Sequence, residues 1–256
     1  MKLQFLGTCA CDYSPKLENE FKNSFDFDAR RSSAVFLDES FLIDCGDHTV
    51  ESLDILKKPY DIISDIFITH IHGDHFCAVN IEKIAKSKKS PLNLCVREGA
   101  HIPDITNVNK IEMKLFRKYE LSNGAFLTSL PANHDARACP QHFIYEKDGK
   151  KMFYGCDGAW LLTETYNHLY GQDLDLMILD ATVGDYEGDY RLAEHNSIPM
   201  IRLMLPSLKT NRTINDSTKI VLSHIAPSLH KPHAQTALIA AGFGALVAYD
   251  GLYMEI

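Results

Sequence analysis

Several short apolar runs in this sequence end abruptly in histidine or aspartate, and no other feature restricts the fold as strongly. The runs are rich in branched and aromatic residues and have the length of buried β-strands. Side chains at the C-terminal ends of neighbouring strands lie along one edge of a sheet, where open α/β folds carry their functional sites. The runs are 66–69 before His70, 126–130 before His134, 152–155 before Asp157, 176–179 before Asp180, and 220–223 before His224.

Hairpins and helices are predicted between these runs. The runs 34–37 and 41–44 flank three turn residues, which is typical of an antiparallel hairpin. Residues 81, 84 and 85 have helical apolar spacing, and Ile198-Pro199 opens another helix with Asn196 or Ser197 as its cap. Hairpins early in each half and helices between later strands favour an α/β fold, with two mixed sheets covered by helices in the order α/β/β/α. We expect residues 1–256 to form a single domain.

Composition limits the partners of this chain. It has 34 acidic and 26 basic residues, a net charge of −8, and therefore lacks the positive field that long nucleic acids favour. Twelve histidines are more than packing requires, and they indicate metal binding. The sequence is compatible with a homodimer.

The location of the protein is predicted from its apolar and cysteine residues. The longest uncharged stretch, 232–249, is divided by glycines into a helix at 234–241 and a strand at 245–249, so we expect no membrane span. The N-terminus has too short an apolar stretch for a signal peptide. Seven cysteines form no disulfide framework, which favours a reducing cytoplasm.

The segment 69–75, Thr-His-Ile-His-Gly-Asp-His, brings three imidazoles and a carboxylate together directly after an apolar run. Side chains two residues apart on an extended chain point the same way, so His70 and His72 can bind one metal ion together. A glycine then turns the chain, which lets Asp74 and His75 face the same place and bind a second ion. A solvated loop would not need this alternation, and the segment therefore predicts a metal centre.

The order His-x-His-x-Asp-His after an apolar strand resembles the signature of the metallo-β-lactamase superfamily, and a resemblance to its phosphonate-pathway cyclic phosphodiesterases extends from 5–8 to 249–255. It implies a four-layer αββα sandwich and a hydrolase in which a hydroxide held by two metal ions attacks the substrate. By the same resemblance, one ion is bound by His70, His72 and His134, the second ion is bound by Asp74, His75 and His224, and Asp157 bridges them.

The donor types restrict the metal. Imidazoles and carboxylates without thiolates suit zinc, manganese or iron, and zinc is the default. The resemblance also implies that Asp44 is the acidic residue beneath the metal loop, where a carboxylate would orient an imidazole. The alternative for Asp44 is a turn residue that caps the segment after it.

Residues 179–182, Leu-Asp-Ala-Thr, and 194–197, Glu-His-Asn-Ser, resemble motifs of the phosphodiesterase branch of that superfamily, which includes tRNA three-prime endonucleases. In that branch an acidic residue holds a histidine that faces the scissile phosphate. The resemblance implies that Asp180 and His195 form a dyad that stabilises phosphoryl charge or protonates the leaving alkoxide. Asp74 is the third predicted catalytic residue.

We expect a small phosphodiester substrate, cyclic ones included. The short interval between His134 and Asp157 leaves no room for the protruding substrate arm of the tRNA endonucleases. Arg30 and Arg31 are candidates for binding phosphate bidentately, although paired arginines at a solvated surface have the same sequence pattern. A thioester or lactone hydrolase on the same metal site is the alternative function, and it would need no Asp180–His195 dyad.

Overall fold

The computed structural model describes residues 1–256, and two mixed β-sheets of seven strands form its framework. The first sheet has the order β14 (Tyr253–Glu255), β1 (Lys2–Gly7), β2 (Ala34–Leu37), β3 (Phe41–Ile43), β4 (Asp65–Phe67), β5 (Leu92–Arg97) and β6 (Val108–Met113). The predicted hairpin is confirmed, because β2 and β3 pair antiparallel with Val35 opposite Ile43. From β3 to β6 all neighbouring strands are parallel.

The second sheet repeats this plan. Its order is β13 (Ala245–Val247), β12 (Lys219–Ser223), β11 (Leu176–Asp180), β10 (Lys150–Gly155), β9 (Gln141–Lys147), β8 (Phe126–Pro131) and β7 (Lys118–Glu120). The strands from β10 to β13 are parallel, and β9 is antiparallel to both β8 and β10. The strands β8, β10, β11 and β12 therefore run in the same direction, and their C-terminal ends lie at one edge of the sheet.

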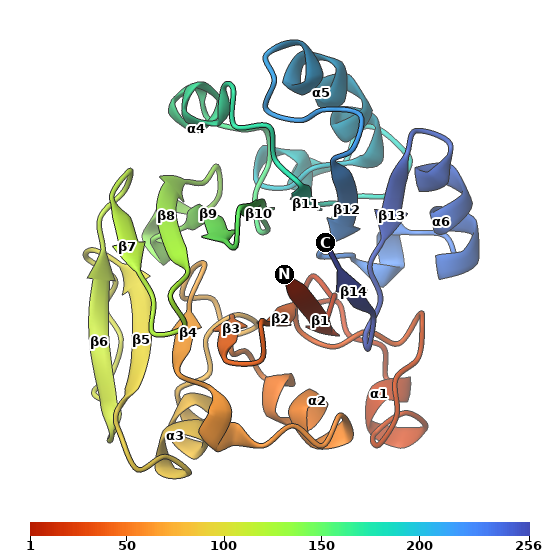
Figure 1. The fold of residues 1–256 in the computed structure, drawn as a ribbon. Helices are drawn as coiled ribbons and strands as arrows, with labels where there is room; N and C mark the ends of the chain where they lie inside the picture. The colour runs from red at the N-terminus through yellow and green to blue at the C-terminus, as the bar shows by residue number, and fades with distance from the viewer.

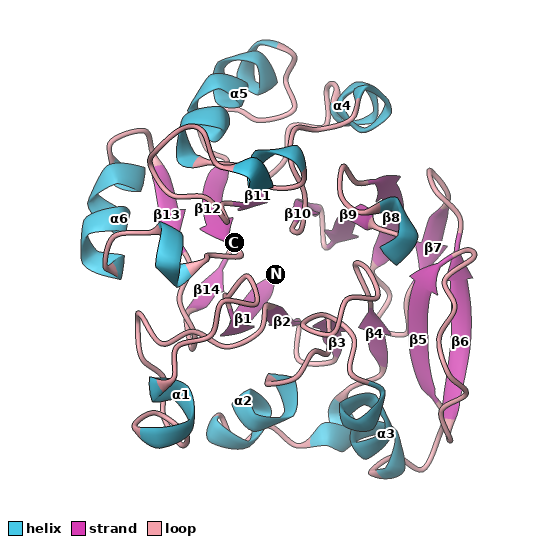
Figure 2. Cartoon of the chain, turned by 180° about the vertical axis from the view of Figure 1, so that it is seen from behind, coloured by secondary structure: helices cyan, strands magenta, loops and turns pink.

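Helices cover the outer face of each sheet, which gives the four layers visible in Figures 1 and 2. The first sheet is covered by α1 (Lys16–Asn19), α2 (Thr49–Ile55) and α3 (Ala78–Lys86), and the second by α4 (Thr163–Leu169), α5 (Ile198–Thr210) and α6 (His233–Ala241). Short 3₁₀ turns lie at Tyr60–Ile62, Ala136–Ala138, Tyr190–Ala193 and Pro227–Leu229. No helix combines the length and the apolar character that crossing a membrane requires.

Local sequence explains where these helices begin and end. The Ser197 side chain accepts a hydrogen bond from Met200 N, so Ser197 is the cap of α5 and Pro199 occupies its first turn. The predicted face of α3 is buried, at Ile81, Ile84 and Ala85. The strand predicted at 245–249 ends earlier, at Val247, because the chain turns before Gly251, whose φ of 86° is readily available to glycine.

The core between the two sheets holds the framework rigid. Phe67 of the first sheet packs on Phe143 of the second with ring centroids 4.5 Å apart, and both side chains are fully buried. Phe41 and Tyr145 meet in the same way at 5.4 Å. These contacts fix the ends of β4 and of the second sheet relative to one another, and the predicted site residues follow those ends.

Candidate metal centre

Three imidazoles from two sheets meet at the end of β4. His70 and His72 follow that strand, and His134 follows β8 of the other sheet. His70 Nε2 lies 2.9 Å from His72 Nδ1, which in turn lies 3.2 Å from His134 Nε2. Three imidazole nitrogens that converge in this way can accept a cation between them, and zinc and similar ions favour such donors.

A second group of donors comes from the turn after His72 and from the end of β12. The turn closes through a hydrogen bond from His75 N to His72 O, 3.0 Å long. It places Asp74 Oδ2 3.2 Å from His75 Nε2, and His224 Nε2 also lies 3.2 Å from His75 Nε2. Asp74, His75 and His224 are all buried, so this second group could also hold an ion away from bulk solvent.

Asp157 lies between the two groups of donors. Its Oδ2 is 3.2 Å from His224 Nε2 and 3.6 Å from His134 Nε2. The same oxygen is 3.9 Å from His70 Nε2 and 4.0 Å from His75 Nε2. One carboxylate oxygen therefore faces both groups, which is the placement that a bridging ligand requires.

Asp44 lies beneath this centre and is fully buried. Its Oδ2 accepts a hydrogen bond of 2.8 Å from His75 Nδ1, which leaves Nε2 directed toward Asp74. Its Oδ1 accepts a hydrogen bond of 2.7 Å from Thr69 N. Burial alone would lower the pKa of His75, but the charges of Asp74 and Asp44 outweigh burial and hold that pKa well above its usual value.

The structure brings Asp180 and His195 together beside the predicted metal ligands. His195 Nδ1 lies 3.0 Å from Asp180 Oδ2, within hydrogen-bond reach, and 2.7 Å from Asp157 Oδ1, so two carboxylates flank one side of the ring. Burial lowers the pKa of His195, yet the charges of Asp157 and Asp180 raise it to about 11. The other ring nitrogen, Nε2, has no protein partner, and the side chain is 14% exposed. His195 can therefore present Nε2 to a bound substrate.

Asp180 also fixes the backbone around these side chains. Its carboxylate is fully buried and accepts hydrogen bonds from the backbone N–H groups of Gly158, Thr182 and Asn196. The Thr182 hydroxyl lies 2.8 Å from His224 Nδ1. Asp180 thus holds the loop after Asp157 and the segment that carries His195 in one arrangement.

His142 is a residue of the site for which the sequence predicts no role. It is buried on β9, and its Nε2 donates a hydrogen bond of 3.0 Å to the Asp157 carbonyl oxygen. Burial lowers the pKa of His142 to about 4, so the ring is neutral at physiological pH. A histidine within an apolar strand gives no local signal of this contact, because its partner belongs to the loop after the next strand.

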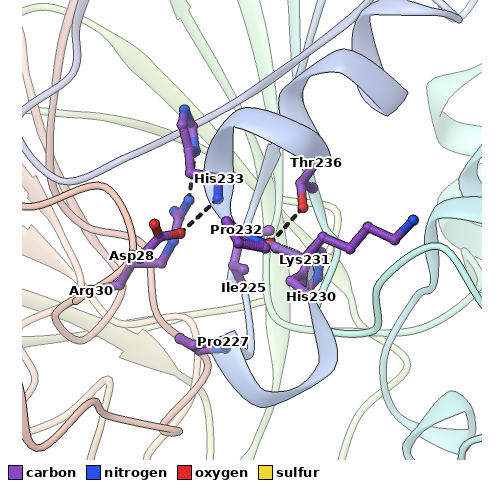
Figure 3. A pocket seen from close by; sticks show the side chains of 9 residues that line it. All are labelled: Asp28, Arg30, Ile225, Pro227, His230, Lys231, Pro232, His233 and Thr236. Carbon is purple, nitrogen blue, oxygen red and sulfur yellow. Dashed lines mark hydrogen bonds between the residues drawn. The ribbon is translucent and has the colours of Figure 1, made fainter.

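Arg30 and Arg31, the predicted substrate contacts, both bond to other residues of the protein. Arg31 is fully buried, bonds to Glu51 Oε1 at 2.7 Å and to Phe21 O at 2.6 Å, and so secures the loop before it. Arg30 is 2% exposed and donates to Thr8 Oγ1, the Ala248 carbonyl and His233 Nδ1. Figure 3 shows Arg30 directed toward His233 in a pocket that no predicted metal ligand lines. Tertiary contacts cover both guanidinium groups, and both bond to other residues of the protein.

Comparisons with known proteins agree with this architecture. A family model described as "Anti-Pycsar protein Apyc1" matches residues 1–98. Ribonuclease Z of Methanococcus maripaludis is 30% identical over 154 residues, which cover 54% of this chain and 47% of that protein. Zinc phosphodiesterase ELAC protein 1 of Homo sapiens is 33% identical over 104 residues, 37% of this chain and 25% of that protein. The chain thus spans less than half the length of either relative.

The fold itself matches a solved structure throughout. The metallo-β-lactamase fold protein YhfI from Bacillus subtilis superposes with a TM-score of 0.75, over 100% of this chain and 99% of that chain, at 12% identity. At that identity the likeness concerns the fold, whereas the curated relatives are named for phosphodiester hydrolysis. The chain therefore has the metallo-β-lactamase fold, and parts of its sequence are similar to proteins named ribonuclease Z and zinc phosphodiesterase.

Proposed function

We propose that this protein is a metal-dependent phosphodiesterase that acts on small phosphodiesters, cyclic ones included. The observation that carries the proposal is the position of Asp157. Its Oδ2 faces both groups of metal-binding side chains, and its Oδ1 lies 2.7 Å from His195 Nδ1. A single carboxylate thus connects two candidate ion sites with a histidine suited to proton transfer. The names of the curated relatives, ribonuclease Z and zinc phosphodiesterase, support the same reaction class.

The donor set fits two divalent ions. The first would be bound by His70, His72 and His134, and the second by Asp74, His75 and His224, with Asp157 shared. Imidazoles and carboxylates suit zinc, manganese or iron, and zinc is the default because one curated relative is named a zinc phosphodiesterase. Such ions supply a nucleophile from water near neutral pH and polarise the phosphoryl oxygens.

The chain's own residues would assist departure of the alcohol. The leaving oxygen of a phosphodiester gains negative charge as its bond to phosphorus breaks, and a proton donor within hydrogen-bond reach neutralises that charge. His195 Nδ1 bonds to Asp180 and lies beside Asp157, so its free Nε2 is the nitrogen that can donate. The ring is stacked on His224 with an interplanar angle of 17°, which fixes its direction toward the metal-binding side chains.

The substrate is proposed to be small for two reasons. The chain has a net charge of −8, which opposes the phosphate-rich surface of a long RNA. The segment between His134 and Asp157 forms only a short 3₁₀ turn and the hairpin of β9 and β10, without a protruding arm. The experiment must therefore be able to detect cleavage of precursor tRNA, which would contradict the proposed substrate size.

The proposal is tested by metal analysis combined with a substrate panel. We expect two ions per chain after purification without chelators, and hydrolysis of bis(p-nitrophenyl) phosphate and of cyclic nucleotides. Turnover of acyl thioesters or lactones without phosphodiesters would replace the proposal with the alternative hydrolase. His195→Ala tests the dyad, and His101→Ala is its control because His101 is exposed and makes no hydrogen bond or ion pair with these residues. Cleavage of precursor tRNA in preference to small esters would contradict the proposed substrate size.

A further inference from the structure

Arg137 is an exposed arginine that its neighbour holds in one orientation. It lies in the 3₁₀ turn Ala136–Ala138, directly after His134, and Asp135 caps that turn by accepting a hydrogen bond from Arg137 N. Arg137 Nε lies 3.0 Å from Asp135 Oδ1, and Nη2 lies 2.9 Å from Asp135 Oδ2. The guanidinium is therefore bound side-on to one carboxylate, which fixes its plane. The side chain is nevertheless 91% exposed, and Nη1 has no protein partner.

The guanidinium lies at the rim of the candidate metal centre. Asp135 Oδ2 is 3.8 Å from His72 Nε2, on the opposite side of the ring from the Nδ1 that faces His70. His134 Nδ1 lies 3.4 Å from the carbonyl oxygen of Glu194, the residue before His195. Arg137 thus belongs to the short segment that contacts both the first metal-binding group and the segment that carries the predicted proton donor.

Among the arginines beside the candidate site, Arg137 is the most exposed. Asp74, Asp157 and Asp180 are buried carboxylates, and the metal-binding motif contributes no lysine or arginine. The arginines at 30 and 31 are buried and bonded to the protein, and Arg191, in the segment before His195, is paired side-on with Asp189 and only 29% exposed. An exposed guanidinium with free N–H groups suits an anionic oxygen, because its planar donors match phosphate and carboxylate groups.

We propose that Arg137 binds a second anionic group of the substrate, a phosphate or carboxylate next to the scissile phosphodiester. This inference rests on the proposed phosphodiesterase function. The contact is assigned to a second group because the Asp135 carboxylate lies between the guanidinium and His72, which keeps Arg137 at the rim. The protein then selects small phosphodiesters that carry an additional negative charge, and Arg137 determines this specificity.

The test compares one dinucleotide phosphodiester with and without a 5′-terminal phosphate, using the metal-loaded protein. We expect wild-type protein to prefer the phosphorylated form in kcat/KM, and Arg137→Ala to reduce this preference about tenfold or more, the loss expected for one charge-assisted contact. Metal content and turnover of the unphosphorylated form should stay unchanged. Arg137→Lys should retain part of the preference, because it keeps the charge but loses the side-on pairing with Asp135.

Arg212→Ala is the matched control. Arg212 is 73% exposed and paired with Asp173, but it lies beside the N-terminal end of β11, at the edge of the sheet opposite the site. A preference that survives Arg137→Ala, or a wild-type protein without any preference, would overturn the inference. If wild-type protein hydrolyses neither dinucleotide, the proposed function fails. In that case, calorimetry of the binding of both dinucleotides tests the inference. Only a role for Arg137 predicts that the Arg137→Ala variant binds the phosphorylated dinucleotide more weakly than wild type does.

Discussion

Replacing Asp44 by asparagine should weaken metal binding at His75 while the protein stays folded. In the structure the Asp44 carboxylate accepts from two donors on opposite sides, Thr69 N at 2.7 Å and His75 Nδ1 at 2.8 Å. An asparagine side chain has one oxygen and one NH₂ group, so it cannot accept from both donors. If its oxygen stays with Thr69, the NH₂ group faces His75.

This exchange changes the tautomer of the imidazole. An NH₂ group opposite Nδ1 favours a histidine in which Nδ1 accepts and Nε2 carries the proton, and a protonated Nε2 cannot bind a metal. His75 Nε2 is the nitrogen that lies 3.2 Å from Asp74 Oδ2. We expect the affinity of the second ion to fall roughly 10–100-fold, equivalent to about 1.4–2.8 kcal/mol. The opposite orientation of the amide would leave the buried Thr69 N–H unpaired, which costs about 1–3 kcal/mol of stability.

The assay is a competition titration with a chromophoric chelator, which resolves the affinities of the two ions. Asp65→Asn is the matched control, because Asp65 is also buried at β4 and accepts from Asn93, Ser122 and Ser64, all remote from the metal ligands. That variant should lose stability in denaturant titrations and keep both metal affinities. If Asp44→Asn binds both ions as wild type does, the tautomer argument is refuted.

Three further changes act on other parts of the site. His195→Ala should lower phosphodiester turnover roughly 10²–10⁴-fold without loss of metal. The loss should be smaller for p-nitrophenyl esters, because their leaving group needs little protonation. An equal loss of rate for both ester types would contradict the role of His195 as a proton donor. His142→Ala should weaken metal binding about tenfold because the Asp157 carbonyl loses its donor, and His142→Gln should restore part of it, as chelator competition would show. Removing the ions should leave the fold intact by circular dichroism, because the packing between Phe67 and Phe143 does not involve them. Restoring metal to 100 times its Kd should raise the unfolding free energy by about 2.7 kcal/mol for each ion bound, and a chain that unfolds on chelation would refute this expectation.

Local sequence determined much of the framework. The alternation of His70 and His72 after an apolar run follows from the two-residue period of an extended chain, and their nitrogens lie 2.9 Å apart. The cap at Ser197 and the hairpin around 38–40 also follow from local chemistry, since each depends on residues only a few positions apart. Such features are predictable because chain geometry alone brings the interacting groups together.

Tertiary structure decided what contacts each of these side chains. His75 and His224 are separated by 149 positions, yet their Nε2 atoms lie 3.2 Å apart because parallel strands of two packed sheets end at the same edge. Arg31 has the sequence pattern of a solvated residue, but its burial against Glu51 depends on how the loop before it folds back. The contact of His142 with Asp157 likewise depends on the pairing of β9 with β10. A sequence pattern specifies which groups a strand end presents, whereas the packing of distant segments determines which group lies opposite and whether water reaches it.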